Sequence, residues 1–273
     1  MTDHTAQRPA EPFTERTPRV VSASKLHRAA ARRKQGRFLA EGPNSVEAAL
    51  ATGAALELFV TEDAAARHPA EVDAARASGV PVSPVTDRAA RALSDTVTPT
   101  GLVALCGTVV RAPESAGETS PRLVAVGQAL AEPGNVGTLV RVADALGVDE
   151  VWFTDGAADP ENPKAVRASA GSLFHVPVVR GVPEDGLVGL AHAAGLQVLA
   201  ATADGEVDVE HADELLARPT AWVFGNEAHG VPAALAAACD ARVRIPIRGR
   251  AESLNIVTAA SICLHTSARL SGR

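Results

Sequence analysis

The feature of this sequence that most restricts its fold is a regular alternation of short apolar segments with helical segments beyond Arg122. The apolar segments cover residues 123–127, 150–154, 175–179, 196–202, 221–225 and 243–247. Helical spacing separates them at residues 135–146, 163–173, 185–194, 211–217 and 231–238, and a long last helix begins at Ser253. Apolar strands joined by helices are typical of a parallel sheet covered on both faces. We therefore predict an α/β domain over residues 122–273.

The preceding part of the chain shows a shorter alternation of the same kind. Helical spacing covers residues 24–36, 45–53 and 63–78, and strand-like segments cover residues 56–61, 80–82 and 102–110. This pattern predicts a separate small α/β domain over residues 19–110. Residues 1–18 are polar and lack periodicity, which predicts a flexible leader. Residues 111–121 combine Pro, Gly, Ser and Glu without a large apolar side chain, which predicts an interdomain linker.

Charge is distributed unevenly along the chain. The net charge is −6, yet the stretch from Arg16 to Ala40 holds eight basic residues and no acidic one. The rest of the chain then carries 18 basic against 32 acidic residues. A concentrated basic stretch on an acidic protein is typical of a phosphate-binding surface, because affinity for nucleic acid depends on local charge neutralisation. A solvated basic arm is the alternative interpretation.

Several classes of protein find no support in the sequence. No apolar run reaches the roughly 18 residues of a membrane span, and the N-terminus lacks a secretory signal, so we expect a cytoplasmic protein without a membrane partner. The three cysteines, Cys106, Cys239 and Cys263, are far apart and form no CxxC pair. They predict neither a disulfide framework nor a metal site. Dinucleotide, nucleotide-triphosphate and hydrolase motifs are missing as well.

The turn after the strand at 123–127 is the first of three that can carry chemistry, since functional groups of α/β sheets collect at the carboxyl ends of strands. Pro133 and Gly134 predict a tight turn there, and Asn135 is suited to cap the following helix. Arg141 lies on the polar side of that helix. By spacing alone, Asn135 is a helix cap and Arg141 is a solvated residue.

Two later turns have the same strand–turn–helix context. In WVFGNEAHGVP, Gly225 allows close approach of a ligand to the backbone, and Glu227 places a carboxylate at the sheet edge. Glu227 is equally compatible with the first turn of a helix. In RIPIRGRAESLN, Ser253 can cap the last helix, whereas Asn255 is expected inside its first turn, where Asn has no helical advantage. A polar residue at that position suggests a function.

Together and in this order, EPGNVGTLVR, VFGNEAHGVP and IPIRGRAESLN resemble the three motifs of the SpoU/TrmH family of RNA ribose methyltransferases, within the SPOUT superfamily. The resemblance covers residues 121–270, including the intervening NPKAVRASAGSLFHVPVV. One departure is Glu132, where the family more often has Asp. The segment KLHRAAARRKQGRFLAEGPNSVEAAL resembles the small RNA-binding domain that precedes the catalytic domain in many relatives.

The resemblance implies a parallel-sheet SPOUT domain with a deep trefoil knot, a homodimer, and S-adenosylmethionine as the methyl donor. It implies a family catalytic set of Asn135, Arg141, Glu227, Ser253 and Asn255. It also implies cofactor binding, largely by backbone, around Thr202, Gly225, Ile245 and Leu254. A guanidinium with a pKa above about 12 is a poor base, so we expect Arg141 to bind a phosphate or the developing alkoxide, with the general-base assignment left open.

The implied reaction is methyl transfer to a ribose 2′-hydroxyl of RNA, and 23S ribosomal RNA is the expected substrate because of the separate N-terminal domain. A housekeeping and a drug-resistance enzyme both fit. A tRNA 2′-O-methyltransferase and a non-catalytic RNA-binding or ribosome-assembly protein of the same fold are the alternatives. The residues expected to bind RNA are all basic: Lys25, Arg28, Arg32, Arg33, Lys34, Arg37, Lys164, Arg167, Arg248 and Arg250.

Overall fold

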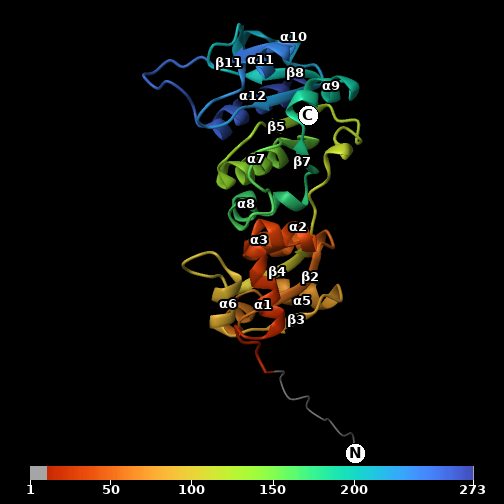
Figure 1. Ribbon diagram of the computed structural model, residues 1–273, viewed down its shortest axis with the longest axis vertical. Coiled ribbons are helices and arrows are strands. Elements are labelled where there is room, and N and C mark those ends of the chain that lie inside the picture. The colour runs from red at the N-terminus through yellow and green to blue at the C-terminus, as the bar shows by residue number, and fades with distance from the viewer. Residues whose placement is uncertain (1–10, 273) are drawn as a thin grey trace, which may run out of the picture. The chain divides into compact units, whose positions relative to one another are not determined.

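The computed structural model of the chain describes residues 11–272. The chain divides between Gly107 and Thr108 into two compact units. Each unit is an α/β structure with its own sheet and core, and Figure 1 labels many of the elements of both.

The first unit is built on a four-stranded mixed sheet in the order β1-β4-β2-β3. Its strands are β1 (Arg37–Glu41), β2 (Ala55–Val60), β3 (Val82–Pro84) and β4 (Leu102–Gly107). Strand β4 is antiparallel to both neighbours, and β2 and β3 are parallel. Its helices are α1 (Pro18–Ser24), α2 (Ala29–Gln35), α3 (Pro43–Ala51), α4 (Glu62–Arg67), α5 (Pro69–Ala77) and α6 (Asp87–Leu93), with a 3₁₀ turn η1 (Lys25–His27).

Apolar side chains of α1, η1 and α6 form one core of this unit. Val20, Leu26 and Leu93 pack there against Phe59 of β2 and Val103 of β4. Helices α3 and α5 pack on each other, and α3 also packs on the central strand β4. Burial of these side chains at about 25 cal/mol per Å² is the main force that holds the helices to the sheet.

The second unit contains a seven-stranded parallel sheet in the order β7-β6-β5-β10-β8-β11-β9. Its strands are β5 (Leu123–Gly127), β6 (Glu150–Thr154), β7 (Val178–Val182), β8 (Gln197–Ala201), β9 (Val207–Asp208), β10 (Thr220–Phe224) and β11 (Ala241–Arg244). Its helices are α7 (Pro133–Ala145), α8 (Pro163–Ser169), α9 (Leu187–Ala193), α10 (Asp213–Leu216), α11 (Ala233–Ala238) and α12 (Ile256–Leu270). Short 3₁₀ turns are η2 (Pro113–Ser115), η3 (Ser172–Phe174), η4 (Glu184–Gly186) and η5 (Val209–His211).

Helices cover both faces of this sheet, as the apolar alternation predicts. Leu187 of α9 and Leu235 of α11 pack against Val126 and Val223 of the central strands. Helices α7 and α12 pack on each other and on β5, and α12 also packs on β10. The register places Gly127, Phe224 and Ala201 side by side at the ends of β5, β10 and β8. The segments that follow these strands therefore start from one edge of the sheet.

Two predicted irregular segments are ordered instead. Of the predicted leader, residues 1–10 lie outside the described residues, but Phe13 forms a bridge with Val85 and α1 already begins at Pro18. Of the predicted linker, Arg111 bridges to Val179 at the edge of β7, and Ala116 belongs to the core of the second unit. The structure places residues 108–121 in the second unit rather than between the units.

Proline explains several differences in the predicted elements. The helix predicted over 63–78 is divided into α4 and α5, and Pro69 starts the second one, because the residue before a proline is disfavoured in a helix. Strand β11 ends at Arg244 and not at residue 247, with Pro246 shortly after it. Strand β1, which carries the buried Phe38, was not predicted because it follows the basic helix α2 with only Gly36 between them.

Candidate active site

The carboxylate of Glu227 ties together two of the three turns. It accepts hydrogen bonds from the backbone N–H groups of Ala131 (3.0 Å) and Glu132 (3.2 Å) and from Nδ2 of Asn135 (2.9 Å). Ala131 and Glu132 precede α7, and Asn135 lies in its first turn. The structure thus brings the predicted residues Asn135 and Glu227 into direct contact. Asn135 does not cap the helix as expected, since Glu132 occupies the cap position and accepts from Gly134 N–H.

The turn that carries Glu227 is held by its own sequence. Nδ2 of Asn226 donates to the Ala129 carbonyl (2.8 Å), and its Oδ1 accepts from Ala228 N–H (2.9 Å). Asn226 also pairs with Gly230 through the backbone. A Cβ on Gly225 would lie 2.1 Å from the Gly230 carbonyl carbon. Gly225 is therefore required for the turn to close on itself, whereas the sequence suggested close approach of a ligand.

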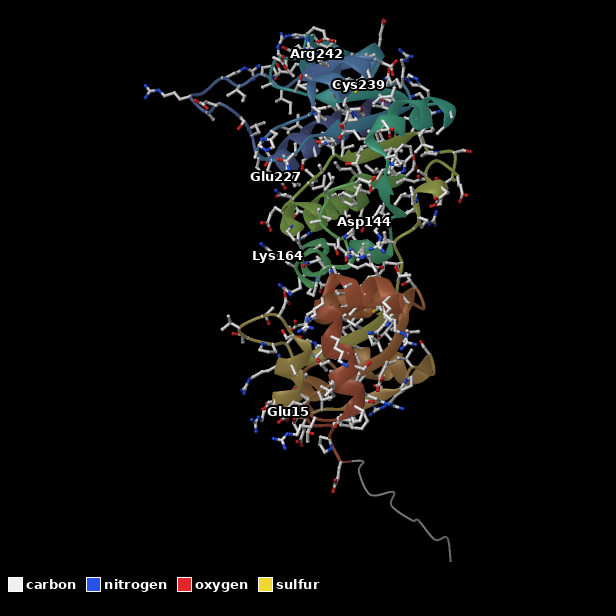
Figure 2. The ribbon with its side chains drawn as sticks, in the orientation of Figure 1. Glu15, Asp144, Lys164, Glu227, Cys239 and Arg242 are labelled. Carbon is white, nitrogen blue, oxygen red and sulfur yellow. The ribbon has the colours of Figure 1, made fainter. Side chains whose placement is uncertain are left out.

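A second acidic residue extends this network to α8. Oε1 of Glu132 accepts from Nζ of Lys164 at 2.5 Å as well as from Gly134 N–H. Figure 2 labels Glu227 and Lys164 among the side chains of the second unit. Lys164, predicted as an RNA contact, is exposed but is paired with Glu132 in this structure.

Hydrogen bonding keeps both carboxyl groups charged. Burial opposes the charged form of Glu227, but the hydrogen bonds from Asn135 and the backbone outweigh it, so the pKa of Glu227 lies below its ordinary value of 4.5. The hydrogen bond from Lys164, followed by that from Gly134, lowers the pKa of Glu132. A carboxylate with a lowered pKa is a weak proton acceptor. The hydrogen bonds of Glu227 therefore indicate that it orders the loop over residues 129–135.

Arg141 lies on α7, and its side chain is exposed. Within residues 11–272, no other side chain forms a hydrogen bond or ion pair with its guanidinium. A charged fork of N–H donors that is not occupied by the protein can take up a phosphate or an oxyanion.

The third turn differs from the prediction at its end. Helix α12 begins at Ile256, and Asn255 is its cap, with Oδ1 accepting from the N–H groups of Val257 (2.9 Å) and Thr258 (3.3 Å). Capping therefore explains why Asn255 is polar. The sequence alone did not indicate this, because the predicted helix begins at Ser253. Ser253 is exposed in the loop before it.

Three of the residues predicted to hold the cofactor lie directly after the carboxyl ends of three neighbouring strands. Thr202 follows β8, Gly225 follows β10 and Ile245 follows β11. The hydroxyl oxygen of Thr202 is buried and has no hydrogen-bond partner among the described residues. Buried polar atoms are seldom left unpaired, so this orphaned oxygen fits a ligand that supplies a polar contact here, as S-adenosylmethionine would.

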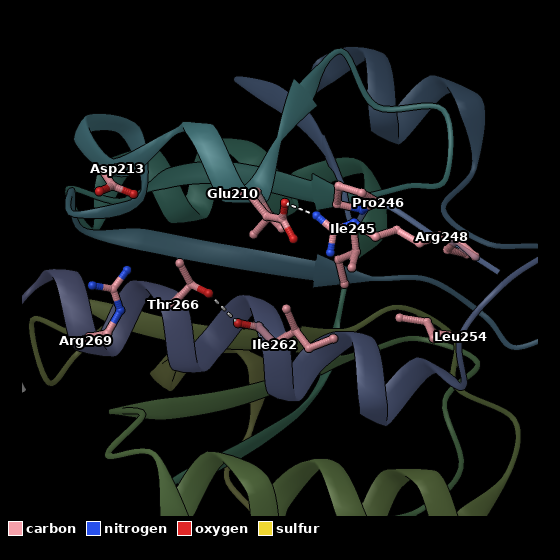
Figure 3. A pocket seen from close by; sticks show the side chains of 11 residues that line it. Glu210, Asp213, Ile245, Pro246, Arg248, Leu254, Ile262, Thr266 and Arg269 are labelled. Carbon is pink, nitrogen blue, oxygen red and sulfur yellow. Dashed lines mark hydrogen bonds and ion pairs between the residues drawn. The ribbon is translucent and has the colours of Figure 1, made fainter.

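A cavity of about 560 Å³ opens beside the third turn, shown in Figure 3. Ile245 and Leu254 line it, together with Ile262 and Thr266 of α12. An ion pair of 2.7 Å between Arg248 and Glu210 crosses its rim. Thr202 and Gly225 are not among the residues that line this cavity.

One of the predicted RNA-binding residues is buried and structural. Arg32 is only 2% exposed, and its Nη1 donates to the carbonyls of Leu26 (2.8 Å) and His27 (3.0 Å). It holds η1 against α2, so the prediction for Arg32 is wrong. Arg167 is half-buried on α8. The other predicted basic residues of both units are exposed: Lys25, Arg28, Arg33, Lys34, Arg37, Arg248 and Arg250.

Two residues of the site were not among those predicted. Asn226 and Glu132 hold the two loops together, as described above. The sequence does contain a signal for the capping role of Glu132. Proline is favoured in the first position of a helix, so the residue directly before Pro133 is expected to cap α7. Among the described residues, there is no group of acidic, His and Cys side chains arranged to hold a metal ion. None of the helices in residues 11–272 has the length and apolar character needed to cross a membrane.

Comparison with known proteins identifies both units. Residues 122–265 match the model of the SpoU rRNA Methylase family, and residues 17–104 match the MRM3-like substrate binding domain. The 23S rRNA (guanosine(2553)-2′-O)-methyltransferase of Bacillus subtilis is 33% identical over 249 residues, which are 90% of this chain and 94% of that protein.

Solved structures agree over both units. The AdoMet-bound rRNA methyltransferase of Sinorhizobium meliloti aligns with a TM-score of 0.80 at 29% identity, over 93% of this chain and 95% of that one. The SpoU methyltransferase AviRb of Streptomyces viridochromogenes, in complex with AdoMet, aligns with a TM-score of 0.79 at 26% identity, over 93% and 98% of the two chains.

Proposed function

The chain belongs to the SpoU family of S-adenosylmethionine-dependent RNA 2′-O-methyltransferases, and we propose that its substrate is a ribose of 23S ribosomal RNA. The observation that carries the proposal is the match to the Bacillus subtilis 23S rRNA enzyme, which spans both units and not the catalytic unit alone. The RNA contacts of the first unit are then expected to select the substrate.

The described residues suit a reaction controlled by positioning. When bound, S-adenosylmethionine supplies the methyl group. Glu227 and Asn135 order the loop before α7, and this fixes the start of the helix that carries Arg141. Arg141 is free to bind the target phosphate or to stabilise the negative charge that develops on the 2′-oxygen. Correct placement of two bound reactants can account for roughly 7–11 kcal/mol of a reaction barrier.

RNA capture is assigned to exposed basic side chains. In the first unit these are Arg28, Arg33, Lys34 and Arg37, with Lys25 beside them in sequence. In the second unit they are Lys164 on α8 and the loop residues Arg248 and Arg250, together with the half-buried Arg167 of α8. Lys164 and Arg248 would exchange their carboxylate partners, Glu132 and Glu210, for phosphate.

The homodimer and the trefoil knot are further parts of the proposal. The apolar side chains of Ile247, Leu254 and Ile262 are more than a third exposed around one cavity, which supports a protein partner on this surface. After β11 the chain returns past β8 to place α12 on β10, β5 and α7. The knotted connection that the family resemblance implies would lie in this part of the chain.

Methyl transfer from tritium-labelled S-adenosylmethionine tests the proposal directly. We expect purified protein to label 23S ribosomal RNA at a 2′-oxygen and to leave tRNA unlabelled. Arg141→Ala should reduce transfer by at least about 100-fold, since removing a donor to a developing oxyanion costs this much, with cofactor affinity in equilibrium dialysis unchanged. Arg218→Ala, an exposed arginine outside the site, is the control.

The possible outcomes separate the alternatives. Labelling of tRNA and not of 23S ribosomal RNA would assign the chain to tRNA modification. Binding without transfer to either RNA would indicate a non-catalytic protein. Full activity of Arg141→Ala would remove Arg141 from the reaction.

A further inference from the structure

A second cavity, of about 340 Å³, lies entirely within the first unit. It is lined by polar and apolar residues of several elements, among them Arg19 of α1, Gln35 of α2, Arg37 of β1, Leu56 and Glu57 of β2, and Pro81. Its volume falls at the lower end of the range of small-ligand sites. A cavity of this size suits one nucleotide.

Leu56 forms an apolar wall of this cavity because β2 is irregular at this residue. Ala55 pairs with Cys106 and Glu57 with the adjacent Leu105, so Leu56 is an extra residue in the strand. A bulge of this kind redirects side chains, and bulges are frequent at functional sites. Leu56 is 43% exposed, whereas Ala55 and Glu57 on either side are buried.

Of the two carboxylate oxygens of Glu57, only Oε1 accepts hydrogen bonds from described residues. Ser83 Oγ donates to Glu57 Oε1 at 2.6 Å, and Arg19 Nη1 reaches the same oxygen at 3.3 Å. No group within residues 11–272 donates to Oε2. The Glu57 side chain is 12% exposed and lines the cavity. One oxygen of a fixed carboxylate is therefore available to an N–H donor.

The rim of the cavity is basic. Arg37 is exposed at the start of β1, and the Arg19 side chain is 62% exposed although it contacts Glu57. Gln35 ends α2, whose preceding residues Arg33 and Lys34 are exposed. Phosphate groups are attracted to such a rim, whereas the carboxylate inside repels phosphate and accepts hydrogen bonds from donors such as the N–H groups of a base.

We propose that this cavity binds one unpaired nucleotide of the RNA substrate. The base lies against Leu56 and Pro81 and donates an amino or imino N–H to Oε2 of Glu57, and the adjoining phosphate contacts Arg37. Proteins read single-stranded RNA in this way, by holding a splayed-out base on a side-chain surface and pairing with its edge. The inference rests on the proposed function only in that the ligand is RNA.

Equilibrium binding tests this site separately from catalysis. The affinity of the full chain for deproteinised 23S ribosomal RNA is measured by filter binding, for Leu56→Asn, Glu57→Gln and Arg37→Ala. We expect each variant to bind at least about fivefold more weakly, because Leu56→Asn and Glu57→Gln each weaken a base contact and Arg37→Ala removes a phosphate contact. Cofactor affinity should not change in any of them, and Leu56→Asn and Arg37→Ala, which change exposed residues, should keep the wild-type melting temperature. Leu56→Met should bind as the wild type does.

Matched controls come from the same unit. Arg88→Ala removes an exposed arginine of α6, and Val21→Asn changes an exposed apolar residue of α1. Neither residue lines the cavity, so neither variant should bind RNA more weakly. Ultraviolet cross-linking should attach RNA to the peptide that contains Leu56.

Three results would overturn the inference. These are unchanged RNA affinity in all three cavity variants, equal losses in the controls, and cross-links confined to other peptides. A wild-type protein that binds RNA through this cavity but methylates none would instead contradict the proposed function alone.

Discussion

Glu227 shows how one side chain organises a site at the residue scale. Its carboxylate takes three hydrogen bonds from a loop more than ninety residues earlier in the chain. Hydrogen bonds to a charged acceptor contribute more than those to a neutral one, about 1.5–3 kcal/mol each in favourable sites. Because Glu227 is exposed, solvent reduces these contributions.

Glu227→Gln should lower the melting temperature by about 2–4 °C at pH 7, which corresponds to about 1 kcal/mol for a unit of this size. The amide resembles a protonated carboxyl group and loses the charge-assisted bonds. The pKa of Glu227 is below 4.5 in the folded chain, so its contribution is complete above pH 4.5 and is lost as the pH falls through the lowered pKa. Calorimetry of both proteins from pH 3 to pH 7 measures this difference.

Glu214→Gln is the control, since Glu214 is exposed on α10 and should show no such difference. A difference between Glu227→Gln and the wild type that persists unchanged to pH 3 would mean that the charge of Glu227 does not hold the loop.

Close packing of α7 on α8 is decisive at the scale of elements, because α7 carries Arg141 and α8 carries Lys164. Gly137 permits this contact. A Cβ at residue 137 would lie 2.0 Å from the carbonyl oxygen of Ala165 and 2.8 Å from Cβ of Ala168. The backbone of α8 cannot move aside as a flexible side chain could.

Gly137→Ala should therefore lower the free energy of unfolding by about 1–3 kcal/mol, although alanine by itself favours a helix by about 1 kcal/mol. Urea denaturation measures the change. Gly189→Ala in α9 is the matched control, since a Cβ there meets no atom within 4 Å, and it should be neutral or stabilising. Equal effects of the two substitutions would show that α7 and α8 do not pack at Gly137.

The segment after the first unit matters at the scale of the whole molecule. Two buried carboxylates hold it on the second unit. Oε1 of Glu161 accepts from Thr108 Oγ1 (2.6 Å) and Val109 N–H (3.0 Å), and Glu150 accepts from Gly117 N–H (2.9 Å). The backbone of Arg111 adds to the edge of β7. The connection is therefore part of the catalytic unit.

Glu161→Gln should release this segment, because a buried, 2% exposed carboxylate loses its charge-assisted bonds. We expect a loss of about 1–3 kcal/mol in urea denaturation and faster proteolytic cleavage between residues 108 and 121. Glu118→Gln changes an exposed residue of the same segment and should leave both measurements unchanged. Unaltered cleavage of Glu161→Gln would contradict the proposed attachment.

The sequence by itself determined the class of fold and which turns are the candidates for chemistry. Strand and helix patterns are properties of short segments, so the parallel sheet of residues 122–273 and its three turns were predictable. The same periodicity predicts that Asn135, Arg141 and Glu227 lie in, or just after, turns that join a strand to a helix.

Only the tertiary structure decided which residues meet and which are structural. Asn135 contacts Glu227 because β5 and β10 are neighbours in the sheet, although they are far apart in sequence. Arg32 lies in a basic stretch that predicts solvent exposure, yet the packing of η1 on α2 buries it. Asn255 caps α12 because the loop before it continues two residues beyond Ser253. Such partners depend on strand order and packing, which local periodicity does not contain.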